Sequence, residues 1–283
     1  MIMNMEEMLK KAQSGKYAVP QFNVNNLEWA KFILEECEAN KSPVILGISE
    51  GAIKYMGGYK TVANMLKALI ADLKITIPVA IHLDHGSSVE SCLSAISAGF
   101  SSVMIDASRN SLDLNIELTS KVVKVAHKYS VTVESEVGTI SGSEDGITGS
   151  ETFATIEECM AMYNKTKIDA LAPALGSVHG LYKGEPNLQF KRMLEISNKI
   201  PTPLVLHGGS GIPDDKIREA INCGITKINV NTELQIAWAK DVRHFLATDS
   251  RTYDPRKIIK AGEKGLKKTV REKILLFGSN EKA

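Results

Sequence analysis

Short apolar segments alternate with longer segments of helical periodicity along most of this 283-residue chain. The apolar segments have the character of buried strands and span residues 17–23, 43–49, 77–83, 102–106, 131–137, 168–174, 203–208 and 225–230. Strands that alternate with helices predict a parallel sheet. Eight such units in a chain of this length favour a (β/α)8 barrel, an α/β fold, over the alternative of a doubly wound open sheet. No composition shift marks a second domain, so residues 1–283 are predicted to form one domain, with extra helices in the basic segment from about Asp254 onward.

Three of the intervening segments carry recognisable helix signals. Ser87 and Glu90 have the spacing of a capping box, and Gly99 is placed to end the helix that follows. Asp214 and Asp215 mark the start of another helix, which Gly224 ends. A third helix is predicted from an apolar stripe made by Leu114, Leu118, Val122 and Val125.

The overall charge and the cysteines exclude several classes of protein. Lys plus Arg number 34 and Asp plus Glu number 33, so nothing favours nucleic acid or an anionic membrane as a bulk partner. The cysteines lack metal-type spacing and are predicted to be reduced thiols: Cys37, Cys92, Cys159 and Cys223. The start of the chain lacks the pattern of a signal peptide, and no apolar run approaches the length of a membrane span. A cytoplasmic protein is the expectation.

Polar and ionisable residues gather where the predicted strands end, which in a barrel is where active sites lie. Four of the six histidines fall at these positions. The strand-end residues are His82, Asp84 and His85 on the third strand, Asp106 on the fourth, Glu134 and Glu136 on the fifth, His179 after the sixth, His207 on the seventh and Asn229–Thr232 on the eighth.

Histidines from three strand ends can complete a metal site that keeps an open position. Imidazole suits zinc, and an open fourth position is typical of catalytic zinc. His85, His179 and His207 each have a glycine beside them, which lets a ligand approach the backbone. His82 lies deeper along the same strand face as Asp84, where a hydrogen-bonded structural role is the better interpretation.

The seventh strand is followed by a glycine-rich loop, HGGSGIPDD (207–215), that runs into a helix. In barrels the loops after strands seven and eight often hold phosphate through backbone N–H groups. Lys183 can add a positive charge to the same rim. A second loop, GTISGSEDGITGSET (138–152), is too long for an ordinary connection and is predicted to be a mobile flap.

Ten short motifs occur in an order that matches a known family. They are QFNVNN (21–26), SPVILGISEG (42–51), YMGGY (55–59), VAIHLDHG (79–86), SVMIDAS (102–108), VESEVG (133–138), LAPALGSVHGLYKGEP (171–186), PLVLHGGSGIP (203–213), KINVNTE (227–233) and YDPRK (253–257). Through these motifs nearly the whole chain resembles the zinc-dependent class II aldolases of the fructose-bisphosphate and tagatose-bisphosphate group. The stretch SRNSLDLN (108–115) departs from the family pattern, and an altered loop shape is expected there.

The resemblance implies a metal centre with one catalytic Zn²⁺ per subunit. His85, His179 and His207 match its ligands. Asp106 and Glu136 match carboxylates that can bind metal in alternate positions. Whether a monovalent cation assists phosphate binding is left open.

The resemblance also implies roles in the reaction. Asp84 matches the acid/base at the C4 hydroxyl, and Glu144 in the flap matches a residue that exchanges a proton on dihydroxyacetone phosphate. Residues that match the substrate site are Asn23, Ser49, Gly180, Lys183, Gly208, Gly209, Ser210, Asn229, Val230, Asn231 and Thr232. Arg256 matches an arginine that reaches a neighbouring subunit and holds the far phosphate, which implies a homodimer or higher homo-oligomer.

Fructose 1,6-bisphosphate is the favoured substrate because Asn231 is polar where tagatose-type relatives often have alanine; tagatose 1,6-bisphosphate is the alternative. A zinc amidohydrolase is disfavoured, since the first strand carries QFN rather than His-x-His. A non-enzymatic sugar-phosphate binder has no need for Asp84 beside three histidines. Lys227 could be suspected as a Schiff-base lysine, but an ion pair or packing role is the better interpretation.

Overall fold

The computed structural model describes residues 1–283 except 145–146, 150–151, 181 and 183. Eight parallel strands close into a barrel in the order β1-β2-β3-β4-β5-β8-β10-β11, with β11 paired to β1. Their bounds are Val19–Asn23 (β1), Val44–Ser49 (β2), Val79–Gly86 (β3), Ser102–Ile105 (β4), Thr132–Val137 (β5), Ala170–Pro173 (β8), Leu204–Leu206 (β10) and Ile225–Val230 (β11). The predicted barrel is confirmed and the open sheet is excluded, because a closed ring has no edge strand.

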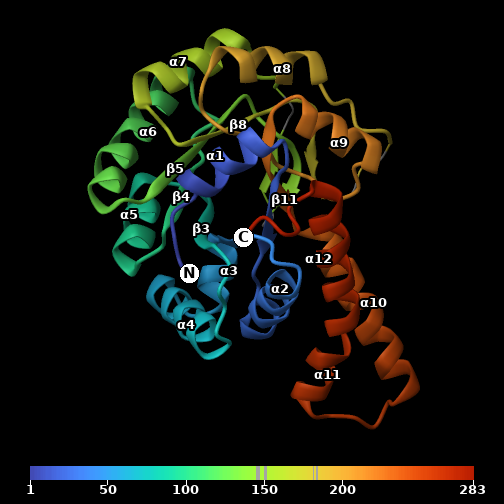
Figure 1. Cartoon of the computed structure of the whole chain (residues 1–283). Coiled ribbons are helices and arrows are strands. Elements are labelled where there is room, and N and C mark those ends of the chain that lie inside the picture. Colours follow the sequence, from blue (N-terminus) through green and yellow to red (C-terminus); the bar gives the residue numbers. More distant parts are fainter. Residues whose placement is uncertain (145–146, 150–151, 181, 183) are drawn as a thin grey trace.

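Helices surround the barrel (Figure 1). They are α1 (Glu6–Gly15), α2 (Leu27–Ala39), α3 (Glu50–Tyr55), α4 (Tyr59–Asp72), α5 (Val89–Ala98), α6 (Leu112–Ala126), η1 (His127–Tyr129), α7 (Ile156–Thr166), α8 (Phe190–Lys199), α9 (Asp214–Asn222), α10 (Thr232–Thr248), α11 (Pro255–Ala261) and α12 (Glu263–Phe277). Outward-facing strand residues such as Phe22, Leu46 and Ile81 are fully buried beneath these helices. Because both faces of the strands are covered, the strands are almost continuously apolar in sequence.

The barrel interior changes from apolar to polar along the strands. Helix α1 lies across one end (Figure 1), where its buried Met8 and Leu9 pack with inward residues Val19, Ala80 and Val205. Two residues further along their strands come polar side chains that period-two alternation directs to the same interior, such as Gln21 after Val19 and His82 after Ala80. A further step reaches Asn23 and Asp84. The polar groups therefore collect at the carboxyl ends of the strands, above an apolar base.

The long segment after β5 forms a small second sheet. Strands β6 (Ser141–Glu144) and β7 (Ile147–Gly149) pair antiparallel, and β6 pairs in parallel with β9 (Val178–His179). Gly142 has φ 103°, and a Cβ there would lie 2.2 Å from the carbonyl oxygen of His179, so only glycine fits. The mobility expected of this segment stays a prediction.

The C-terminal helices form an arm that extends away from the barrel (Figure 1). Helix α12 packs against α2 and α10, and Trp29 of α2 contacts Trp238 of α10 with ring centroids 6.1 Å apart. Helix α11 lies at the outer end of the arm (Figure 1). The helices expected after about Asp254 are thus present. In the part of the chain that the structure describes, no helix is both long and apolar enough to cross a membrane.

Two predicted helix details are wrong. The N-cap of α5 is Ser88, which accepts a hydrogen bond from the Ser91 N–H, whereas Ser87 instead donates to Glu50. In α6 the predicted Leu114 is 40% exposed, because the buried face is rotated toward residues that include polar ones. Those residues are Asn115, Ile116, Thr119, Val122, Val123 and Ala126. Asn115 and Thr119 are buried because they hydrogen-bond to Glu136 O and Ser135 Oγ of β5, which an apolar pattern does not register.

Candidate active site

Three histidine rings meet at the carboxyl end of the barrel. His85 comes from β3, His179 from β9 and His207 from the residue after β10. Their ring centroids lie 5.0 Å (His85–His179), 4.7 Å (His85–His207) and 5.8 Å (His179–His207) apart. One ring nitrogen from each lies within 4.8 Å of the others, so all three can hold one ion.

For two of the three rings, a carboxylate fixes which ring nitrogen carries the proton. His85 Nδ1 lies 2.8 Å from Asp106 Oδ2, and His207 Nε2 lies 2.8 Å from Glu134 Oε1. Burial opposes ionisation of both carboxyls. Hydrogen bonds from His85 and Ser108 nevertheless hold the pKa of Asp106 well below its usual value. The charge of Lys227 and the hydrogen bond with His207 do the same for the pKa of Glu134. An ionised carboxylate only accepts hydrogen bonds, so the facing ring nitrogen is the protonated one.

The remaining nitrogens of these two rings face each other. His85 Nε2 and His207 Nδ1 lie 2.9 Å apart, and each then presents a lone pair. Two lone pairs at this distance repel unless a cation lies between them. Burial lowers the pKa of His207 and of His179, which keeps the rings neutral and able to bind a metal. Metal-binding histidines typically donate their other N–H to a carboxylate, so the residues present fit a divalent ion.

A second group of possible ligands adjoins the first. Ligand atoms of His85, Asp106 and Glu136 also lie within 4.8 Å of one another. Burial, with the nearby charge of Asp106, raises the pKa of Glu136 to about 8. Glu136 Oε1 accepts from the Ile140 N–H at 3.2 Å. These contacts are compatible with the alternate metal position expected from the sequence.

Asp84 is buried beside the histidines and is held by two amides. Asn23 Nδ2 donates to its Oδ2 at 2.9 Å, and Asn229 Nδ2 donates to its Oδ1 at 3.4 Å. Burial opposes ionisation, but His85, His207 and Lys227 hold the pKa of Asp84 well below its usual value. The carboxylate is therefore an ionised, oriented proton acceptor.

An irregularity in β3 allows Asp84 and His85 to face the same site. Consecutive residues of a regular strand point to opposite faces. His85 has φ 51°, and the pairing of β3 with β4 shifts register between Leu83 and Gly86. A Cβ on Gly86 would lie 2.6 Å from the Met104 carbonyl oxygen, so the close approach of β4 requires glycine.

A cavity of about 460 Å³ opens beside the histidines. Its lining includes His85, His179, Asp106, Glu136 and Arg109. Ser49, the N-cap of α3, also lines it. Arg109 follows the turn that Ser108 makes by hydrogen-bonding to Asp106 Oδ1 through its N–H (3.2 Å) and its hydroxyl (2.7 Å).

The glycine-rich loop lies against the start of α10. Gly208 has φ 62°, and a Cβ there would lie 2.1 Å from the Val178 carbonyl oxygen. Ser210 Oγ accepts from the Glu233 N–H at 3.3 Å. The N-cap of α10, Asn231, makes no side-chain capping bond. The N–H groups at a helix N-terminus can bind an anion in place of a cap.

The other residues singled out in the sequence are placed as follows. Gly209 donates its N–H to Asn229 O at 2.9 Å, which joins the glycine-rich loop after β10 to the end of β11. Val230 is fully buried in the core around the barrel. Gly180 follows β9 with φ 92°, and Thr232 begins α10. Glu144 ends β6, and Lys183 lies outside the described residues.

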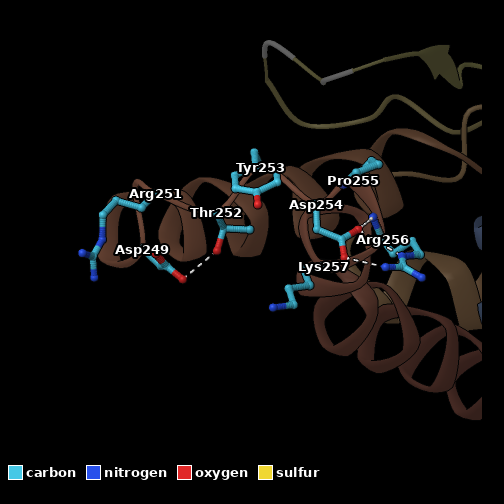
Figure 2. A pocket seen from close by; sticks show the side chains of 8 residues that line it. All are labelled: Asp249, Arg251, Thr252, Tyr253, Asp254, Pro255, Arg256 and Lys257. Carbon is cyan, nitrogen blue, oxygen red and sulfur yellow. Dashed lines mark hydrogen bonds and ion pairs between the residues drawn. The ribbon is translucent and has the colours of Figure 1, made fainter.

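Arg256 is not brought to the histidines within one chain. Figure 2 shows it in a surface hollow at the outer part of the arm, where its guanidinium contacts Asp254. Its side chain is 89% exposed. The contact of Arg256 with the active site of a neighbouring subunit, which the resemblance implies, stays a prediction.

Two features of the site were not assigned from the sequence. Glu134 was noted at a strand end without a role, although its period-two relation to Glu136 places both in the barrel interior. Arg109 was missed because the loop after β4 was expected to affect only local shape. Lys227 and His82 have the structural positions expected of them: Lys227 Nζ lies 2.8 Å from Glu134 Oε2, and His82 Nδ1 lies 2.8 Å from Ser102 Oγ.

Comparisons with known proteins agree with the barrel and its site. A family profile described as Fructose-bisphosphate aldolase class-II matches residues 3–282. The chain is 56% identical over 283 residues to a fructose-bisphosphate aldolase of Geobacillus stearothermophilus and 54% identical to a probable fructose-bisphosphate aldolase of Bacillus subtilis, covering 100% of this chain and 99% of each relative. The crystal structure of the YdjI aldolase from Escherichia coli K12 has a TM-score of 0.88 at 32% identity and covers 100% of both chains. A putative fructose-1,6-biphosphate aldolase from Coccidioides immitis has a TM-score of 0.88 at 26% identity, covering 98% of this chain and 96% of that one.

Proposed function

Because the chain belongs to the class-II fructose-bisphosphate aldolase family, we propose that it cleaves fructose 1,6-bisphosphate reversibly to dihydroxyacetone phosphate and glyceraldehyde 3-phosphate. In this proposal His85, His179 and His207 hold a Zn²⁺ ion. The observation that carries the proposal is the pair of facing ring nitrogens, His85 Nε2 and His207 Nδ1, 2.9 Å apart beside Asp84. When bound, zinc supplies a Lewis acid that stabilises the negative charge left on the substrate oxygens as the C3–C4 bond breaks. Asp106 and Glu136 provide an alternate position for the ion.

The chain's own residues then move the protons. Asp84 accepts the proton of the C4 hydroxyl as the bond breaks and returns it in the reverse direction. Its two oxygens are oriented by Asn23 and Asn229, which supports this role. Glu144, on the flap strand β6, exchanges the proton on the carbon of dihydroxyacetone phosphate.

The two phosphates are held at opposite ends of the substrate. Backbone N–H groups of the glycine-rich loop and of α10, together with Lys183, bind the phosphate of the dihydroxyacetone half. The absence of a side-chain cap on α10 supports this anion site. The substrate-binding residues assigned by this proposal are Asn23, Ser49, Gly180, Lys183, Gly208, Gly209, Ser210, Asn229, Val230, Asn231 and Thr232.

The far phosphate is bound by Arg256 of a neighbouring subunit, so the working enzyme is a homodimer or a larger homo-oligomer. The 89% exposure of the Arg256 side chain and the place of its helix, α11, at the outer end of the arm (Figure 1) support this arrangement. The reaction belongs to glycolysis in the cytoplasm. A monovalent cation near the phosphate is an optional addition to this proposal.

Fructose rather than tagatose bisphosphate is the proposed sugar. Asn231 Oδ1 is buried without a hydrogen-bond partner among the described residues, so it is available to a sugar hydroxyl. The two sugars differ in configuration at C4. Kinetics on both bisphosphates with the same preparation decide between them, and a higher kcat/KM for the tagatose compound would overturn this choice.

Metal removal tests the reaction class. Treatment with a chelator is expected to abolish cleavage, and Zn²⁺ or Co²⁺ is expected to restore it. Borohydride added with substrate is the control, since it traps the Schiff base of a lysine mechanism and is expected to leave no adduct. Activity that survives chelation, together with a borohydride adduct, would refute the metal mechanism.

A further inference from the structure

A fully buried ionic cluster lies directly beneath the three histidines, on the side toward α1. Glu134, Lys227 and His82 come from β5, β11 and β3, and all three side chains have no exposed surface. The reaction proposed above uses none of them. Burying a charged pair has a desolvation cost that an apolar pair of similar volume avoids, so a structural role alone does not explain its presence.

The two oxygens of Glu134 have different partners. Oε1 lies 2.8 Å from His207 Nε2. Oε2 lies 2.8 Å from Lys227 Nζ and 3.8 Å from His82 Nε2. Lys227 thus holds one oxygen of Glu134 and leaves the other directed at His207, whereas His82 Nε2 lies too far from Oε2 for a hydrogen bond. Rotation of the carboxylate away from His207 would break the ion pair with Lys227.

We infer that Glu134 is a positioning residue for the metal centre: it holds the Nε2–H of His207 so that Nδ1 faces the ion, and Lys227 fixes the carboxylate for that purpose. This inference rests on the proposed zinc site. A neutral imidazole has one protonated nitrogen, and the hydrogen bond that one nitrogen makes decides which is left for the metal. His85 is set by Asp106 in the opposite sense, with Nδ1 protonated and Nε2 facing His207 Nδ1. The two rings therefore converge on one point through unlike nitrogens.

The same role explains why the acceptor for His207 is a charged carboxylate accompanied by Lys227. An uncharged acceptor such as an amide oxygen could receive the His207 proton, but an amide has a second, donating end that permits the reverse orientation. A carboxylate offers no donor, so only one protonation pattern of His207 is compatible with it. The lysine balances the buried charge that this requires.

Two double variants separate positioning from structure. Glu134→Leu/Lys227→Met removes both the ion pair and the acceptor for His207. Glu134→Gln/Lys227→Met removes the ion pair but keeps an acceptor oxygen. Both delete the same charges, and melting curves of the metal-free proteins report any difference in folding.

Zinc affinity, measured by competition with a coloured chelator, is the principal readout. The leucine variant is expected to lose about 10- to 100-fold in zinc affinity, which is the usual effect of removing a partner of a ligating histidine. The glutamine variant is expected to lose less zinc affinity than the leucine variant, because its amide oxygen can still accept the His207 proton although its NH₂ group also permits the reverse orientation. With Co²⁺ in place of zinc, the visible absorption spectrum is expected to change in the leucine variant only. Equal zinc affinity in the two double variants would overturn the inference.

A measurement on the unaltered protein covers the case in which the leucine variant does not fold. Nitrogen-15 NMR of the histidine rings in the zinc-loaded protein is expected to show His207 protonated at Nε2 and His85 at Nδ1. A His207 proton on Nδ1 would refute the inference. Failure of the unaltered protein to bind zinc would instead refute the proposed function, so the two failures are distinguishable.

Discussion

At Asp84 a single carboxylate has two amide partners and two neighbouring imidazoles. Asn23 and Asn229 each orient one oxygen, and His85 follows directly in sequence. The left-handed conformation of His85 brings both side chains to the same site. Removing the Asp84 carboxylate therefore removes a proton acceptor while leaving the three imidazoles in place.

Asp84→Ala is expected to retain zinc and to lose turnover. Loss of general base catalysis lowers kcat by about 10²- to 10⁴-fold. Metal analysis and steady-state kinetics on the same sample provide the check, and His207→Ala is the control that is expected to lose zinc as well. Near-normal kcat in the Asp84 variant would refute its assignment as the base.

Glu136 predicts a pH dependence of stability in the metal-free protein. Its pKa is raised to about 8 from an ordinary value of 4.5. Between these values the folded protein holds a proton that the unfolded chain has released, so the stability contributed by this group falls as pH rises from 4.5 to 8. A raised carboxyl pKa thus stabilises the protonated folded form at low pH and destabilises the fold at high pH.

The variant Glu136→Gln removes this titration. The free energy of unfolding of the variant minus that of the unaltered metal-free protein is expected to be larger at pH 9 than at pH 5. Urea unfolding of both proteins at both pH values measures this difference. Glu117→Gln, on the exposed face of α6, is the control and is expected to show no such difference. A stability difference for Glu136→Gln that is the same at pH 5 and pH 9 would contradict the prediction.

The sequence predicted which residues form the site better than it predicted the geometry of that site. His85, His179 and His207 were predicted to converge, and they do. His85 and His207 lie where barrel strands end, and β9, which follows barrel strand β8, brings His179 to the same rim. The left-handed φ of His85 could not be predicted, since it depends on the register shift that brings Met104 O close to Gly86. Arg109 was missed because nothing local distinguishes a rim arginine from any other surface arginine.

Among the elements, α1 closes one end of the barrel, a role that was not predicted from its sequence. The first residues were noted only as acidic and amphipathic. In the structure Met8 and Leu9 close the end of the barrel against Val19 and Val205. Amphipathic periodicity predicts a buried face but not which surface covers it.

Leu9→Ala is expected to destabilise the protein by about 2–5 kcal/mol, because it leaves a cavity at the barrel base. Leu9 is fully buried. Its neighbour Lys10 makes an exposed ion pair with Glu6, so Lys10→Ala is the control, with an effect within about 0.5 kcal/mol. Chemical unfolding measures both; similar effects of the two substitutions would show that α1 does not seal the barrel.

Strands were predictable and helix faces less so. The eight apolar runs match the barrel strands to within a few residues, because strands buried on both faces have a continuous apolar signal. The face of α6 was misjudged because Asn115 and Thr119 are buried through hydrogen bonds to β5. Ser88 rather than Ser87 caps α5, since Ser87 is hydrogen-bonded to Glu50 of another helix, a tertiary contact that spacing does not reveal.

For the whole molecule, the arm formed by α10, α11 and α12 is the feature that one subunit does not explain. Helix α11, which contains Arg256, lies at the outer end of this arm (Figure 1). The proposed homodimer places this arginine at the far phosphate of the neighbouring site. The ion pair with Asp254 orients the guanidinium at the start of α11 (Figure 2).

Arg256→Ala is expected to raise KM for the bisphosphate much more than KM for dihydroxyacetone phosphate in the reverse reaction, because the latter lacks the far phosphate. Arg251→Ala, an exposed arginine in the same hollow, is the matched control and is expected to leave both values near normal. Sedimentation of each variant shows whether assembly is retained. Equal changes in the two KM values for Arg256→Ala would contradict a contact with the far phosphate.

Within the part of the chain that the structure describes, α1 leaves the barrel blocked at one end. Substrate and both three-carbon fragments must then pass through the same mouth, between the loops that follow the strands.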